Sequence, residues 1–412
     1  MTPPAIRLSA AFNRLAWSNL AAQSAEQIGL AAAPLVAVLA FGADAGATGI
    51  LQTAQTLPFL LLSIPAGVLA DRMSRRRLMA GAEALRALSL VAVLTLAGLG
   101  LLTWPLLGLL GFVGACGTVA YSVAAPALVP ALVSPKALAA ANGRIELART
   151  VAFAGGPALA GALVGWTGAT PAFAVAAALS IGAVFLLAGL REPARPKRPQ
   201  RHPLRELREG AAFVFRHRLL LPIFATQLVF NTAYFILQAV YVPYAVRRLG
   251  LSAAVIGVTL AVYGIGMVAG ALLAARVMRA LPFGTVIAIG PLSGLAAALT
   301  MVLTIWLPSG ALAGLGFFLM GGGPILWVIS TTTLRQLVTP PALLGRVSAI
   351  FATGYGARPL GAAIGALIGG VYGAETCLVV AALGFAIQAL IILLSPVPSL
   401  SRQPDSVAAQ PA

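Results

Sequence analysis

Two groups of polar side chains interrupt long apolar stretches of this sequence at helical spacing. The first group is Asn19, Gln23, Glu26 and Gln27, and the second is Gln227, Asn231, Tyr234, Gln238 and Tyr241. Because a helix turns by about 100° per residue, each group would gather on one face of a helix. Such a face could bind a polar ligand, or it could join neighbouring helices through hydrogen bonds.

Glu26 is the only carboxylate near the middle of a predicted membrane span. An ionised acid at that depth costs roughly 2.5 kcal/mol or more on insertion scales, so acids there serve function or pairing. Glu26 is therefore the first candidate for taking up and releasing protons. A second pair of charges, Glu83 and Arg86, has the spacing of an ordinary ion pair on one helix.

Arg358 also lies deep in an apolar stretch, with Phe351 and Tyr355 on its helical face. It could bind an anionic ligand group, or pair with Glu26 in one conformation. Alternatively, it could contact a backbone carbonyl freed by Pro359, because proline removes one hydrogen bond of a helix.

The elements that hold these residues must lie in a membrane. The 412 residues are 60% hydrophobic and only 9% charged, with a mean hydropathy of +0.96. A soluble domain carries roughly 25% charged residues. Apolar runs of about 20 residues cross a bilayer as helices, and their continuity here excludes a barrel of short alternating strands.

The sequence predicts an all-α membrane protein of twelve transmembrane helices. Spans are expected at 15–41, 47–70, 78–102, 104–128, 147–167 and 170–190, and then at 219–245, 253–275, 283–307, 311–334, 347–372 and 374–395. They define a six-helix bundle at 1–190, a basic cytoplasmic linker at 191–218, a second six-helix bundle at 219–398 and a disordered cytoplasmic tail at 399–412.

Basic residues indicate the orientation. The Lys and Arg residues outside the spans lie almost entirely on one side, with Arg247 and Arg248 as the exceptions. Cytoplasmic loops are enriched in such residues, so both termini are expected in the cytoplasm. This placement, rather than nucleic-acid binding, accounts for the net charge of +17.

An internal repeat supports two related bundles. LVSP at 132–135 recurs as LVTP at 337–340, and Pro157 matches Pro359 at the same offset as Gly143-Arg144 and Gly345-Arg346. Halves related in this way are typical of transporters. Cys116 and Cys377 lie in apolar segments and both histidines in the linker, so neither a disulfide nor a metal site is expected.

The loop GVLADRMSRRR at 67–77 resembles a signature of the major facilitator superfamily. Its matching residues are Gly67, Asp71, Arg72, Arg75 and Arg76, whereas Ser74 stands where the family usually has glycine. The resemblance implies two pseudo-symmetric bundles. It also implies a conformational latch, in which Asp71 packs at the cytoplasmic start of the eleventh helix, where the helix dipole favours a carboxylate. The alternative is that these arginines only set the topology.

The fifth predicted span resembles the antiporter signature of that superfamily, with Gly156, Pro157 and Gly161 matching and Ala152 and Ala160 replacing two glycines. This resemblance implies export of a substrate coupled to inward movement of a proton. The alternative is that small residues simply allow close helix packing. The opening of the chain, 12–42, is similar to the branch of siderophore exporters and other secretion permeases.

The resemblance implies a substrate cavity lined by the first and seventh spans. Its expected residues are Asn19, Gln23, Gln27, Gln227, Asn231, Tyr234, Gln238, Tyr241, Trp327 and Arg358, with Glu26 for proton coupling. The expected function is efflux of a small amphipathic molecule (drug, siderophore or metabolite) by alternating access, by a monomer in a bacterial inner membrane. The proton gradient supplies the energy, and no cofactor, metal, nucleic acid or enzymatic activity is expected. A lysophospholipid flippase or a metabolite importer is the alternative.

Overall fold

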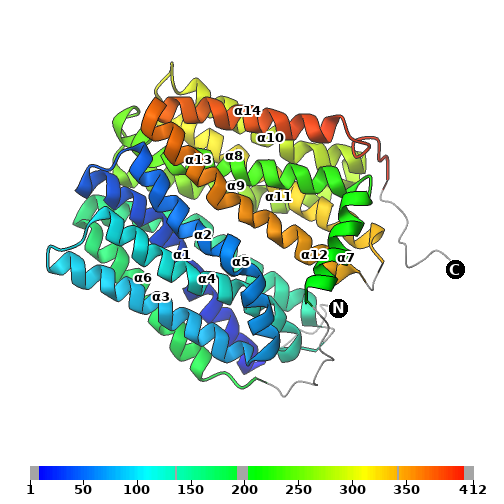
Figure 1. The fold of residues 1–412 in the computed structure, drawn as a ribbon, viewed down its shortest axis with the longest axis horizontal. Coiled ribbons are helices and arrows are strands. Elements are labelled where there is room, and N and C mark those ends of the chain that lie inside the picture. Colours follow the sequence, from blue (N-terminus) through cyan, green and yellow to red (C-terminus); the bar gives the residue numbers. More distant parts are fainter. Residues whose placement is uncertain (1–8, 135–136, 193–202, 341–342, 403–412) are drawn as a thin grey trace, which may run out of the picture. The chain divides into compact units, whose positions relative to one another are not determined.

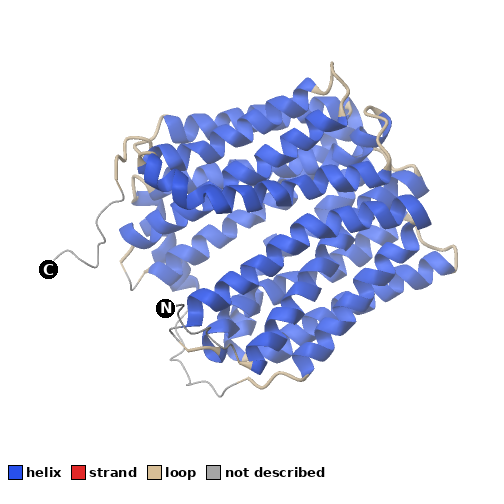
Figure 2. Cartoon of the chain, turned by 180° about the vertical axis from the view of Figure 1, so that it is seen from behind, coloured by secondary structure: helices blue, strands red, loops and turns tan. Residues whose placement is uncertain are grey.

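In the computed structural model, helices joined by short loops make up the described part of the chain (Figures 1 and 2). The structure describes all residues except 1–8, 135–136, 193–202, 341–342 and 403–412. Helices close their own backbone hydrogen bonds, which suits a chain with few polar side chains. The helices are α1 (Ala10–Phe41), α2 (Ala45–Arg72), α3 (Arg75–Gly98), α4 (Trp104–Leu132), α5 (Leu138–Thr167), α6 (Ala169–Ala188), α7 (Pro203–Arg216), α8 (Leu220–Arg247), α9 (Ala253–Ala280), α10 (Phe283–Leu303), α11 (Gly310–Val338), α12 (Leu344–Thr353), the short 3₁₀ helix η2 (Gly354–Gly356), α13 (Ala357–Tyr372) and α14 (Ala374–Leu393).

Eleven of the twelve predicted spans are confirmed as helices that are long and apolar enough to cross a membrane, within the described residues. The span predicted at 347–372 is different, because η2 divides it into α12 and α13. Pro359 has no N–H to donate to the carbonyl four residues earlier, and Gly354 and Gly356 tolerate the tighter turn. The single helix predicted there is therefore corrected to two helical pieces.

The chain forms two compact units. The first comprises Met1–Ala43, Ala54–Arg198 and Ser252–Ala261, and the second comprises Asp44–Thr53, Pro199–Leu251 and Val262–Ala412. Within the first unit α1 packs on α5 and α6, and α3 packs on α4 and α6. Within the second, α8 packs on α13 and α14, and α10 packs on α11 and α14. The same pairing therefore recurs in both units, in agreement with the internal repeat.

Each unit also takes in the start of a helix whose remainder belongs to the other unit. In the second unit, Gly49 of α2 packs against the backbone of Ala366 in α13. In the first unit, Gly257 of α9 packs against Gly161 of α5, where an added Cβ would lie 2.8 Å from the Gly161 Cα. Small residues at both places allow two helix backbones to touch.

The predicted basic linker contains α7, which packs against α12 (Figure 1). Its apolar residues Leu207, Ala211 and Val214 recur every three or four positions and join the core of the second unit. Arg346 of α12 pairs with Glu209 and lies 3.7 Å from Glu206. Residues 193–202 of the linker and 403–412 of the predicted tail lie outside the described residues.

Candidate functional site

The polar face predicted on α1 is divided between different neighbours. Asn19 is buried and its Nδ2 donates to the Ile145 carbonyl of α5 at 3.4 Å. Gln27 is buried against Gly156 of α5, where an added Cβ would lie 2.5 Å from the Gln27 Cβ. These two side chains join helices, which was the alternative to substrate binding. Gln23 is only partly buried.

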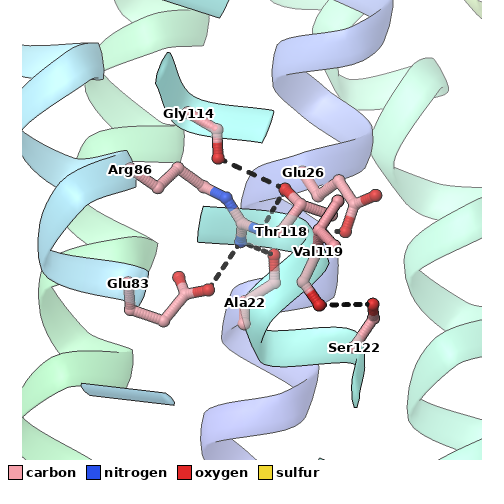
Figure 3. Close-up of polar contacts among 8 residues, drawn as sticks. All are labelled: Ala22, Glu26, Glu83, Arg86, Gly114, Thr118, Val119 and Ser122. Atoms are coloured by element: carbon pink, nitrogen blue, oxygen red, sulfur yellow. Dashed lines mark hydrogen bonds and ion pairs between the residues drawn. The ribbon is translucent and has the colours of Figure 1, made fainter. Parts of the chain in front are cut away.

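Glu26 lies near an arginine of the first unit that also pairs with a second carboxylate (Figure 3). Glu83 and Arg86 of α3 form the predicted ion pair, with 2.8 Å between Arg86 Nη1 and Glu83 Oε1. Arg86 Nη2 lies 3.9 Å from Glu26 Oε2. Glu83 is 0% exposed and Arg86 5% exposed, whereas the Glu26 side chain is 18% exposed. The arginine therefore links a fully buried acid to a partly accessible one.

Neutral groups complete the surroundings of Arg86. Its Nη1 donates to the Ala22 carbonyl of α1 at 2.9 Å, and its Nη2 donates to the Thr118 hydroxyl of α4 at 2.6 Å (Figure 3). The buried hydroxyl of Ser180 in α6 lies next to Glu83. Residues of α1, α3 and α4 thus fix the guanidinium of Arg86, whose five N–H donors allow it to bind several partners at once.

The geometry corrects the expectation that Arg86 is an ordinary helical partner of Glu83. A pair of this kind on a helix surface is exposed to solvent, as Glu146 and Arg149 are here, with side chains 53% and 35% exposed. Burial was the feature that sequence reasoning missed. The available signal was that both charges fall inside a predicted span, with the small residue Ala87 and the polar Ser89 close by.

Arg358 at the start of α13 has contacts of a different kind in the second unit. Its guanidinium lies 4.4 Å from the ring centre of Tyr355 and 5.5 Å from that of Phe235, both within cation–π range. Its Nε donates to the Asn231 side-chain oxygen at 3.3 Å. Tyr355 is 44% exposed, so this group of residues is accessible on one side.

The polar face predicted on α8 supports the broken helix beside it. Gln227 donates from Nε2 to the carbonyl of Phe351 at 2.8 Å, in the last turn of α12 before η2. Asn231 donates to the Gln227 carbonyl at 2.9 Å. Both amides thus stabilise the local backbone, and Asn231 also holds Arg358. The carbonyl that Pro359 leaves without its helical donor is that of Tyr355, so the contact of Gln227 with Phe351 is a separate one, and the freed-carbonyl role considered for Arg358 stays a prediction.

The predicted cavity aromatics are not equivalent. Tyr241 is 0% exposed and packs edge-on against Phe317 at 4.6 Å between ring centres, so it cannot reach a ligand in this conformation. Its assignment to a substrate surface is therefore corrected to a core position. Tyr234 accepts a hydrogen bond from Gln238 at 2.8 Å, and both are partly buried. Trp327 is partly buried against the core of the second unit.

The 67–77 loop is organised by a carboxylate that follows α6. Glu192 accepts hydrogen bonds from the Ser74 hydroxyl at 2.6 Å and from the Arg76 amide at 3.1 Å, at the amino terminus of α3. Arg76 in turn donates to the Leu190 carbonyl at 3.0 Å. Ser74 has a φ of −59°, so the position usually occupied by glycine needs no left-handed backbone here. Serine can therefore serve as the helix cap.

The proposed latch residues are only partly described. Arg72 is exposed and Arg75 is partly buried, and among the described residues nothing lies within 4 Å of a Cβ added at Gly67. Asp71 falls in the last turn of α2, but its side chain lies outside the described part of the chain. Its latch role stays a prediction.

The residues of the helix-5 motif make close helix contacts. Gly156 packs on α1, and the Pro157 carbonyl and Gly161 lie against Gly257 of α9. A Cβ added at Gly161 would be 2.7 Å from the Gly257 Cα. These are the close contacts that the packing interpretation expected, and the antiporter role of the motif stays a prediction.

Arg248, which breaks the pattern of basic residues, is neutralised by a neighbour. Its Nε lies 2.9 Å from Glu375 Oε1 at the start of α14, and both side chains are about half exposed. No group of three or more His, Cys, Asp or Glu side chains within the described ranges could hold a metal ion.

Comparison with known proteins gives one consistent result. Residues 8–366 match the family model described as Major Facilitator Superfamily. The chain is 28% identical to the uncharacterized MFS-type transporter y4rN of Sinorhizobium fredii over 375 residues, covering 87% of this chain and 86% of that one. It is also 28% identical to the enterobactin exporter EntS of Citrobacter koseri over 339 residues, covering 80% and 78%. Among solved structures, a POT family transporter in complex with 5-aminolevulinic acid superposes with a TM-score of 0.75 at 14% identity, covering 95% and 96%.

Proposed function

Because the chain belongs to the Major Facilitator Superfamily, and is therefore a multi-pass membrane transporter rather than an enzyme, we propose that it exports a small amphipathic molecule in exchange for protons. The export would proceed by alternating access in a bacterial inner membrane, with the protein working as a monomer. Both termini would lie in the cytoplasm.

The observation that carries proton coupling is the environment of Glu26. It is an ionisable side chain in the middle of α1, it is 18% exposed, and a buried arginine lies 3.9 Å away. A carboxyl that can reach water yet senses a fixed positive charge can exist in either protonation state. A proton bound there shifts a conformational equilibrium only if the two conformations bind it with different affinity. A change in the distance between Arg86 and Glu26 from one conformation to the other would change the proton affinity of Glu26 in this way.

The direction of transport is supported by two likenesses. The helix-5 motif is similar to that of antiporters, and one of the relatives carries the name of an enterobactin exporter. Arg358, with Tyr355 and Phe235 around its guanidinium, suits a substrate that combines a ring with an acidic group. Siderophores, drugs and acidic metabolites all include molecules of this class.

Glu26→Gln tests the coupling, because glutamine keeps the size of the side chain but fixes a neutral state. The substrate would first be identified as the metabolite that accumulates inside cells lacking the gene and falls in cells overexpressing it. In proteoliposomes, we expect the variant to retain exchange without a proton gradient and to lose gradient-driven accumulation. Glu146→Gln, at an exposed acid, is the matched control. Normal driven accumulation in Glu26→Gln would remove Glu26 as the proton carrier.

The metabolite comparison also separates the alternatives. An importer would give the opposite pattern, with the substrate depleted in cells lacking the gene. A lysophospholipid carrier would instead change the distribution of labelled lipid between the two leaflets of vesicles. Either result would replace export as the proposed function.

The proposed orientation gives a simpler prediction. After Cys116 and Cys377 are replaced, single cysteines at the exposed positions Thr167 and Arg77 are compared in intact cells with an impermeant thiol reagent. We expect labelling at 167 only, because basic loops stay in the cytoplasm. Labelling at 77 but not at 167 would invert the topology.

A further inference from the structure

Glu83 is a fully buried acid that the proposed coupling step does not use. It lies one helical turn from Arg86, and an ion pair at 2.8 Å joins the two side chains. Hydrogen bonds from Arg86 to Ala22 and Thr118 fix the guanidinium from the other helices. All of these groups belong to the first unit. Burying a charged carboxylate away from water costs free energy, and pairing with Arg86 compensates part of this cost for Glu83.

The net charge of Glu26, Glu83 and Arg86 together depends on whether a proton is bound. With both carboxyls ionised, Glu26, Glu83 and Arg86 together carry one negative charge, and a single bound proton makes the group neutral. In this conformation Arg86 lies 1.1 Å closer to Glu83 than to Glu26, from the distances of 2.8 Å and 3.9 Å. Arg86 is therefore closer to the fully buried acid, whereas Glu26 is the acid that water can reach and that can exchange a proton with it.

We propose that Glu83 is a positioning residue, which holds Arg86 within reach of Glu26 and thereby sets the pH at which Glu26 releases its proton. The proposal rests on the proposed proton-coupled function and adds a second acid to it. On proton release, the Glu26 carboxylate attracts the nearby Nη2 of Arg86, which must loosen its bond to Thr118 to approach. The O–H bond of the Glu26 carboxyl breaks, its electron pair stays on the carboxylate and the proton passes to water, and no other covalent bond changes.

The groups around this pair are few. Among the described residues, the titratable side chains recorded next to it include Glu26 of α1 and Tyr121 of α4, and α6 contributes the neutral Ser180. Tyr121 is 2% exposed and lies 3.5 Å from the Ser18 hydroxyl. The Thr118 hydroxyl, which accepts from Arg86, also donates to the Gly114 carbonyl at 3.5 Å. A change of charge at Glu83 therefore acts on Glu26 mainly through Arg86.

The experiment measures protonation directly and needs no substrate. The full-length protein is purified in lipid nanodiscs, and the carbonyl stretch of protonated carboxyl groups is titrated by infrared difference spectroscopy. The band assigned to Glu26 is the one that Glu26→Gln removes. In Glu83→Gln, Arg86 is no longer neutralised, so we expect the midpoint of this band to fall by about one pH unit, a roughly tenfold loss of proton affinity.

Two further variants complete the design. Thr118→Val keeps every charge and the shape of the side chain but frees Nη2 towards Glu26, so a smaller shift in the same direction is expected. This variant also decides the matter if Glu83→Gln does not fold. Glu83→Asp keeps the charge and should restore the midpoint towards that of the wild type. Glu146→Gln removes an exposed acid with the same spacing to its arginine and should leave the midpoint unchanged.

Each outcome separates the two proposals. An unchanged midpoint in both folded Glu83→Gln and Thr118→Val would overturn the positioning role while leaving Glu26 as the carrier. Loss of the band in Glu83→Gln rather than in Glu26→Gln would also overturn it, because Glu83 would then hold the proton. Failure of the transport function appears elsewhere, as normal driven accumulation in Glu26→Gln.

Discussion

The two units each carry an arginine at the depth of the apolar core, and they hold it by different means. Arg86 in the first unit is 5% exposed and pairs with a buried acid. Arg358 in the second unit is partly exposed and contacts an amide and two rings. A guanidinium can be stabilised either by an opposite charge or by polarizable, neutral neighbours.

The two arginines differ in which side chains would lose their partner if the arginine were removed. Removing Arg86 strands the carboxylate of Glu83 in a site with 0% exposure. Removing Arg358 takes one hydrogen bond from Asn231 and the cation–π contacts from Tyr355 and Phe235, which are all neutral side chains. The first arginine is thus expected to be indispensable for folding, and the second is expected to matter more for what the protein binds.

Arg86→Met is expected to have the largest effect of the substitutions considered. Breaking a buried ion pair by removing one partner costs about 3–5 kcal/mol. Thermal unfolding of the purified protein would measure the loss. Arg149→Met, at the exposed pair with the same spacing, should cost less than about 1 kcal/mol and serves as the control. Equal stability of the two variants would show that Glu83 does not depend on Arg86.

Arg358→Met should have a smaller effect on unfolding, of about 1–2 kcal/mol, because it removes cation–π contacts and one hydrogen bond. The same thermal measurement applies. Export of the identified substrate should fall much more than stability does. If this variant unfolds as readily as Arg86→Met, the contrast between the two arginines is wrong.

The smallest effect is expected from pH, at the start of α8 in the second unit. His217 Nδ1 accepts from the amides of Leu219 and Leu220 at 3.2 and 3.4 Å, which requires an unprotonated nitrogen. Burial, and then the charge of Arg218, lower the pKa of His217 below its usual 6.5. The unfolded chain therefore binds this proton more readily than the folded chain. The stabilisation is complete above pH 6.5 and is lost as the pH falls below it towards the folded-state pKa.

The corresponding helix start in the first unit offers the comparison. The amino terminus of α3 is capped by Glu192 and Ser74 rather than by a histidine. We expect His217→Asn, which keeps an acceptor, to reduce the loss of stability on acidification from pH 7 to pH 5 by about 1 kcal/mol or less. Denaturation followed at both pH values would test this. An unchanged acid sensitivity would assign it to other groups.

Much of the fold could be predicted from the sequence because span length and apolar content report directly on helices in lipid. The prediction failed at 347–372, since hydropathy averages over a run and does not register the missing N–H of Pro359. The i, i+3 spacing likewise gave the Glu83–Arg86 pair but not its burial. Burial depends on which face α4 and α6 cover, and that information is tertiary.

The site residues show the same limit. Helical spacing placed Gln227, Asn231 and Tyr241 on one face, yet the structure gives them separate tasks at a backbone break, at an arginine and in the core. Polar side chains at one face can bind each other, a backbone group or a ligand. Spacing alone cannot distinguish these partners.

The division of the predicted eleventh span by η2 has a consequence for how deuterium enters the protein. Irregular backbone at membrane depth persists only where protein or water supplies the missing hydrogen bonds. Beside this segment, Gln227 adds a hydrogen bond to the Phe351 carbonyl in the last turn of α12. The amides of 354–358 should therefore exchange faster than those at the centre of α8, and a change in their exchange rate with substrate present would report where solvent reaches the middle of the chain's second half.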